Sequence, residues 1–172
     1  MPESPDATRS SANDGAPEDD IRERLRKDHE ATLAEADRLR AESDDQRSLF
    51  LLRQLRRSWV IHALAEESVV YRALEGVEGG PSAGTRSDER FVEHELVEAL
   101  FDKLAHLKPG SHEWRARLNV ARDLIARHIE SEHDDMFARL SRHFDAAGLA
   151  DLGRRFELAR EKLTLLEEAK AA

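Results

Sequence analysis

The sequence contains no cysteine, so disulfides, iron–sulfur clusters, thiolate zinc sites and cysteine nucleophiles are excluded. No segment approaches about 18 consecutive uncharged apolar residues, and the N-terminus lacks a basic start followed by an apolar stretch. We therefore expect no membrane span and no signal peptide. We expect the protein to be cytoplasmic. Any bound metal would depend on histidines and carboxylates.

Aromatic residues are scarce, at 5% of the chain, whereas 37% of the residues are charged and 40% are hydrophobic. This composition is typical of a helical protein with a charged surface rather than of a β-rich protein. The formal net charge of -9 argues against nucleic acid or an anionic membrane as a partner, because both are negatively charged. A chain of 172 residues can form one domain with its own core.

The spacing of apolar residues predicts an all-α fold. Residues 1–17 contain one large apolar residue, Met1, and we interpret them as a disordered N-terminal tail. The glycine-rich run "GVEGGPSAGTRSDE" is expected to contain no helix. Amphipathic helices are predicted over about residues 18–42, 45–76, 88–107 and 111–146. Helices joined in this way most simply form an antiparallel up-down-up-down four-helix bundle over residues 18–146.

A further amphipathic helix is predicted within residues 147–172, where Leu149, Leu152 and Phe156 are three and four positions apart. This C-terminal helix could lie on the bundle, or it could contact a second copy of the chain or another partner.

The motif His-x-x-x-Glu occurs once in each of three predicted helices, and its two residues lie one turn apart on one helix face. In each case this face also carries the apolar residues, and His29 lies on the corresponding face of the first helix. Any one such pair is most simply a surface ion pair. Burying all of them without partners would cost several kcal/mol for each group, a cost that a bound cation would offset. The candidate metal ligands are His29, His62, Glu66, His94, Glu98, His128 and Glu132.

Three other residues lie near this face. His133 follows Glu132 and could orient a ligand or replace one, whereas Glu67 and Asp135 are weaker candidates that we expect to be solvated. No arginine or lysine is expected on the predicted site face.

His29 followed by "HALAE", "HELVE" and "HIESE" over about residues 20–146 resembles the hemerythrin-like (HHE cation-binding) family. The resemblance implies two non-haem iron ions with a bridging oxygen, held by the seven candidate ligands, with Glu66 and Glu132 bridging the two ions. Manganese or zinc would accept the same ligands. A ferritin-like site is disfavoured, because it needs two Glu-x-x-His pairs. In the oxygen-carrying hemerythrins a histidine stands where this chain has Glu98, so we hypothesise a redox or sensing centre rather than an oxygen carrier.

The function predicted from these residues is a di-iron protein that binds or reacts with oxygen, peroxide or nitric oxide, and a catalase-like consumption of peroxide is compatible with it. Two alternatives stay open. One is a helical interaction module with a structural metal, and the other is a metal-dependent hydrolase. The hydrolase is disfavoured because no cationic side chain is expected to clamp a phosphate.

Overall fold

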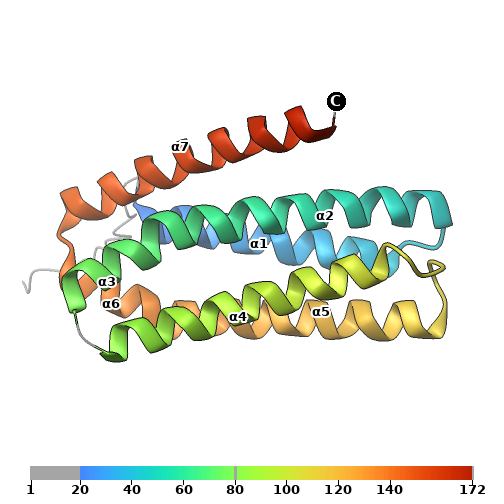
Figure 1. Ribbon diagram of the computed structural model, residues 1–172, viewed down its shortest axis with the longest axis horizontal. Helices are drawn as coiled ribbons and strands as arrows, with labels where there is room; N and C mark the ends of the chain where they lie inside the picture. The colour runs from blue at the N-terminus through green and yellow to red at the C-terminus, as the bar shows by residue number, and fades with distance from the viewer. Residues whose placement is uncertain (1–19, 80, 172) are drawn as a thin grey trace, which may run out of the picture.

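The computed structural model describes residues 20–79 and 81–171, so the predicted tail of residues 1–17 lies outside the described residues. Within the described ranges all regular structure is helical, which confirms the all-α prediction. Four long helices form the body of the molecule, and each runs opposite to the one before it (Figure 1). They are α1 (Ile21–Ala41), α2 (Asp45–Glu66), α4 (Pro81–Leu104) and α5 (His112–Ser131).

Three of these helices begin where a short polar side chain satisfies a free backbone N–H. Asp20 accepts from the Arg22 amide at 2.9 Å, and Asp44 accepts from the Arg47 amide at 2.7 Å. Ser111 accepts from the amide of the residue three positions later at 3.2 Å. Aspartate and serine are favoured here because they replace hydrogen bonds that the first turn of a helix lacks.

A π-helical turn lies next to the glutamate of the predicted motif in two places, after α2 and after α5. The turn η1 (Glu67–Tyr71) follows Glu66 and continues into α3 (Arg72–Glu78), and η2 (Glu132–Met136) continues into α6 (Phe137–His143). Each π turn shifts the helix register. The last predicted bundle helix is therefore interrupted, and it ends at His143 rather than at 146, because Phe144 has extended backbone angles.

The glycine-rich run contains more helix than predicted. α3 extends to Glu78, where Gly79 ends it with φ +59°, and α4 begins at Pro81 instead of at residue 88. Proline is favoured in the first turn of a helix, because its missing N–H is not needed there. The expectation that no helix forms in this run is wrong.

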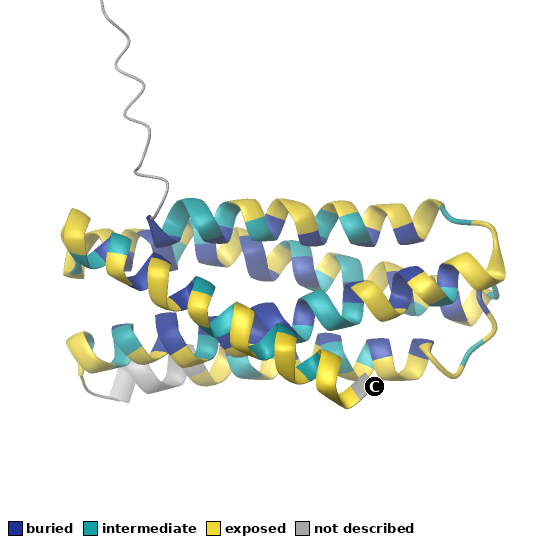
Figure 2. Ribbon diagram, turned by 90° about the horizontal axis from the view of Figure 1, so that it is seen from above, coloured by how far each residue is buried: buried dark blue, intermediate teal, exposed yellow. Residues whose placement is uncertain are grey.

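The interior consists of two hydrophobic clusters with a polar layer between them. The first cluster includes Leu55, Trp59 and Phe101, and the second includes Leu25 and Leu74. Figure 2 shows that buried residues face the inside of the bundle along each helix, whereas exposed residues face outwards. Six of the seven predicted ligands, all except Glu98, lie on the helices between the two clusters.

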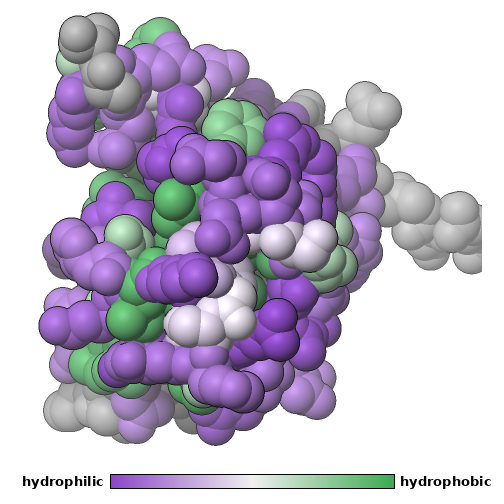
Figure 3. All heavy atoms as spheres, turned by 90° about the vertical axis from the view of Figure 1, so that its right-hand side faces the viewer, coloured by the Kyte–Doolittle hydropathy of each residue, from purple (hydrophilic) through white to green (hydrophobic). Residues whose placement is uncertain are grey.

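Helix α7 (Ala146–Ala171) lies along α2 and diverges from it towards the C-terminus (Figure 1). Its first half is buried in the second cluster through Leu149, Leu152 and Phe156, whereas Leu165 is 67% exposed. The end of the molecule with the α1–α2 and α4–α5 connections is mainly hydrophilic, with separate hydrophobic patches (Figure 3). Among the described residues, no helix has an apolar stretch long enough to cross a membrane.

Candidate metal centre

The four long helices and η2 bring six potential metal ligands together between the two hydrophobic clusters. Each is at most 1% exposed, although histidine and glutamate are seldom so fully buried. They are His29 on α1, His62 and Glu66 on α2, His94 on α4, His128 on α5, and Glu132 at the start of η2.

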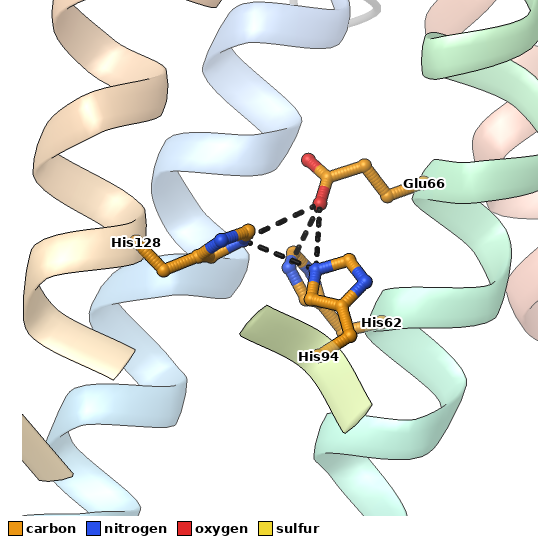
Figure 4. A group of neighbouring side chains, drawn as sticks. All are labelled: His62, Glu66, His94 and His128. Carbon is orange, nitrogen blue, oxygen red and sulfur yellow. Dashed lines mark hydrogen bonds and ion pairs between the residues drawn. The ribbon is translucent and has the colours of Figure 1, made fainter. Parts of the chain in front are cut away.

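The six side chains form two overlapping groups, and in each group the ligand atoms lie within 4.8 Å of one another. His62 and Glu66 belong to both groups. In Figure 4 the Glu66 carboxylate points towards the rings of His62, His94 and His128, which come from three helices. The first group is His62, Glu66, His94 and His128, and the second is His29, His62, Glu66 and Glu132.

The distances between facing atoms are suited to a shared cation. Glu66 Oε2 lies 3.4 Å from His62 Nε2 and 3.6 Å from His94 Nε2, and Glu132 Oε2 lies 3.3 Å from His29 Nε2. These contacts are longer than ordinary charge-assisted hydrogen bonds. Within the described part of the chain, four buried ligand atoms have no hydrogen-bond partner: His29 Nε2, His62 Nε2, Glu66 Oε1 and Glu132 Oε2. Buried polar atoms normally have partners, so imidazole nitrogens and carboxylate oxygens left free in this way fit one or two metal ions.

Each imidazole is also held from behind, through its Nδ1 atom, by a side chain of a different helix. Such partners fix the ring orientation and turn Nε2 towards the site. Together the four contacts close a circuit around the bundle, from α1 to α2, then through η1 to α4, to α5 and through η2 back to α1. The pairs are Asp28 with His62 at 2.9 Å, Glu67 with His94 at 2.8 Å, Glu93 with His128 at 2.9 Å, and His133 with His29 at 3.0 Å.

These four outer partners lie next to ligands in the sequence, which is a signal that sequence reasoning could have used. Asp28 precedes His29, and Glu93 precedes His94. The suggestion that His133 orients a ligand agrees with its contact to His29. The expectation that Glu67 is solvated is wrong, because its side chain is 24% exposed and accepts a hydrogen bond from His94.

The charges of the site suit a cation. Although burial lowers it, the carboxylates of Glu66 and Asp28 raise the pKa of His62 to about 10. Burial and the charge on the neighbouring carboxylate raise the pKa of Glu66, but the imidazoles of His62 and His128 outweigh them and lower it overall. For Glu132 the His128 imidazole likewise outweighs burial and lowers the pKa. Both carboxylates are therefore ionised at neutral pH.

Tyr71, which no sequence pattern indicated, lies against both carboxylates. Its hydroxyl is 2.7 Å from Glu132 Oε1 and 3.0 Å from Glu66 Oε2, so its one proton is shared between them. A π turn brings residue i+5 close to residue i, and η1 does this for Tyr71 and Glu66. Burial, followed by the charge on Glu132, raises the pKa of Tyr71, which keeps the phenol protonated.

A buried arginine also lies beside the site. Arg90 Nη1 is 3.4 Å from Glu132 Oε1, and the Arg90 side chain is 7% exposed. The expectation that no arginine or lysine lies on the site face is therefore wrong. Arg90 precedes His94 by four residues, so the two side chains share one face of α4.

Glu98 is the predicted ligand that the structure does not bring to the other six. It belongs to neither group of potential ligands and is partly exposed, and burial raises its pKa. The buried positions of α4 after His94 are Val97 and Phe101, and Glu98 lies about 100° beyond Val97 around the helix. The hypothesis that a Glu98 ligand distinguishes this site from an oxygen carrier loses its structural basis.

The fold and the clustered ligands define a helical, cation-binding protein. A model of the hemerythrin HHE cation-binding domain matches residues 20–140, so the chain belongs to this family and the resemblance noted from its motifs is confirmed. The chain is 21% identical over 159 residues to a protein from Nostoc sp. named DNA nickase. This similarity covers 91% of the chain but 44% of the relative, so the chain spans less than half of that protein. No solved structure matches the chain significantly.

Proposed function

We propose that this antiparallel four-helix bundle holds two iron ions and consumes or senses oxygen, peroxide or nitric oxide rather than transporting oxygen. The observation that carries the proposal is the convergence of six buried ligands, in two groups that share His62 and Glu66. Imidazole and carboxylate are suitable ligands for iron, manganese and zinc, and of these iron and manganese, unlike zinc, can supply electrons to oxygen-derived molecules.

The burial of the site favours a small substrate. Because each of the six ligands is at most 1% exposed, a polymer or a bulky metabolite cannot touch them without opening the bundle. A diatomic gas or hydrogen peroxide needs only a small fluctuation of packed side chains. Trp59 closes one side, with its ring centroid 5.4 Å from that of His94 and 5.6 Å from that of His128.

Hydrogen-bond donors beside the two carboxylates favour consumption of oxygen or peroxide over reversible transport of oxygen. Tyr71 offers a buried O–H shared between Glu66 and Glu132, and Arg90 offers a buried cation next to Glu132. Reduction of oxygen or peroxide consumes protons, and a positioned proton donor accelerates such a step. We infer that Tyr71 supplies a proton or hydrogen bond to an oxygen-derived ligand.

The test is to load the protein anaerobically with iron(II), to measure the iron content per chain by elemental analysis, and then to measure the consumption of peroxide and of oxygen. We expect two irons per chain, and consumption slowed at least about 100-fold by Tyr71→Phe, the lower end of the range for general acid catalysis. Phe91→Leu is the matched control, because Phe91 packs on the Tyr71 ring without a hydroxyl. Oxygen released intact under vacuum over repeated cycles would refute consumption, and failure to bind iron would refute the proposal.

We do not expect this chain to nick DNA, although the relative from Nostoc sp. is named DNA nickase. A nicked phosphodiester would have to reach ligands that are almost fully buried, and Arg90 is paired with Glu132 rather than offered to a phosphate. The net charge of -9 also repels a duplex. We expect supercoiled plasmid to stay intact with the iron-loaded protein, and nicking that is lost in Glu66→Ala would contradict this.

A further inference from the structure

Helix α7 reaches the metal centre from outside the family match. The match ends at residue 140, and α7 begins at Ala146. Phe156 of α7 is fully buried, and its ring centroid lies 6.5 Å from that of His62. The helix therefore packs behind a ligand that belongs to both groups of the site.

One turn further along α7, Arg160 is joined to the same ligand through Asp28. Arg160 Nη2 lies 2.8 Å from Asp28 Oδ1, while His62 Nδ1 lies 2.9 Å from the other oxygen, Asp28 Oδ2. The two oxygens of one carboxylate thus connect α7 on one side with α2 on the other. Arg160 also lies over the ring of Phe156, at 5.9 Å from its centroid, which is within the range of a cation–π contact.

This connection matters because the Asp28 carboxylate decides how His62 faces the site. When Nδ1–H donates to a carboxylate, Nε2 carries the lone pair and points at the metal. An aspartate held by a cation on its far oxygen keeps one orientation, whereas an unheld aspartate can rotate about its side-chain torsions. The partners of His94 and His128, namely Glu67 and Glu93, come from the bundle itself.

We propose that Arg160 is a positioning residue of the metal centre, which makes α7 part of the site: Arg160 holds Asp28, and Asp28 holds His62 in the coordinating orientation. This inference rests on the proposed function, because it presupposes that metal binds at His62. Helix α7 then supports the metal centre of its own chain, and its exposed C-terminal half can still contact a partner.

The test compares Arg160→Met with Arg154→Met. Methionine keeps the apolar stem and the helix propensity while removing the guanidinium, and Arg154, on the same helix, forms a surface ion pair with Asp151 at 3.2 Å. The iron(II)-loaded proteins are mixed with excess chromogenic iron(II) chelator without oxygen. Loss of an outer partner costs about 10- to 100-fold in metal affinity, so we expect Arg160→Met to release iron about tenfold faster than wild type and Arg154→Met to match wild type.

A double-mutant cycle of Arg160→Met with Asp28→Ala tests whether Arg160 acts on His62 through Asp28. If Arg160 acts through Asp28, adding Arg160→Met to Asp28→Ala accelerates release no further, whereas a purely structural role would add its full effect. Helix content and thermal midpoint are recorded for every variant. Equal release by Arg160→Met and Arg154→Met, or full additivity in the cycle, would overturn the positioning role and leave the proposed function standing. A wild-type protein that takes up no iron would overturn both.

Discussion

Removing the metal should destabilise this protein by an amount that its unpaired ligand atoms predict. Among the residues that the structure describes, four buried atoms of the site have no hydrogen-bond partner, two on imidazoles and two on carboxylates. A buried unsatisfied polar group costs about 1–3 kcal/mol, so the four together cost about 4–12 kcal/mol. Protonation of His62, whose pKa is raised to about 10, offsets part of this cost in the metal-free protein. We therefore expect a value at the lower end, about 4 kcal/mol.

A change of about 4 kcal/mol corresponds to about 8–16 °C in the thermal midpoint for a protein of this size. The assay is thermal unfolding followed by circular dichroism, on metal-free protein and on protein loaded anaerobically with iron(II) or manganese(II). Glu66→Ala should lose most of the metal-induced shift, because Glu66 belongs to both groups of ligands. His106→Ala, which changes an exposed histidine, should keep it.

The result that would refute this reasoning is a loaded protein, verified by metal analysis, that melts within about 2 °C of the metal-free form. Such a result would mean that metal binds elsewhere, or that the polar layer is satisfied without it.

Three further predictions follow from single side chains. Trp59→Ala should lower the free energy of unfolding by about 3–5 kcal/mol in urea titrations, because the ring is fully buried, whereas Val120→Ala, at a 52% exposed position, should change it little. Glu98→Gln should retain two metal ions per chain by elemental analysis and Glu132→Gln should not, and equal losses would place Glu98 in the site. For His62 the folded pKa of about 10 exceeds the ordinary value near 6.5, so its contribution to stability is complete below about pH 6.5 and is lost as pH rises through 10. The melting temperature of the metal-free protein should therefore fall between pH 7 and 10 while that of the loaded protein does not, and parallel curves would contradict this.

Much of the site could be predicted because its ligands repeat one local pattern. His62 and Glu66, like His128 and Glu132, are four residues apart on an apolar face, and helix geometry alone places such pairs side by side. The same pattern wrongly predicted that Glu98 is a ligand, because on its helix Val97 and Phe101 are the residues that face the interior. A rotation of that size depends on how α4 packs against its neighbours, which the spacing within one helix does not encode.

The outer contacts and the π turns could not be read from periodicity. Tyr71 reaches Glu66 only because η1 shifts the register after the ligand, and no residue type in "ESVVY" requires a π turn. Arg90 lies in the first turn of the helix predicted over residues 88–107, and its distance to Glu132 on η2 depends on how two helices dock, which spacing within one helix does not show.

The sequence by itself determined that this protein is helical and which histidines lie on the inner faces of its helices, because these follow from composition and from spacing within single helices. Its membership of the HHE cation-binding family rests on the family match over residues 20–140. The tertiary structure decided which glutamates join those histidines, which side chain holds each imidazole from behind, and that α7 packs on its own bundle near His62. Such relations join residues as far apart in the chain as Asp28 and Arg160, and they are fixed by the rotation and depth at which packed helices meet.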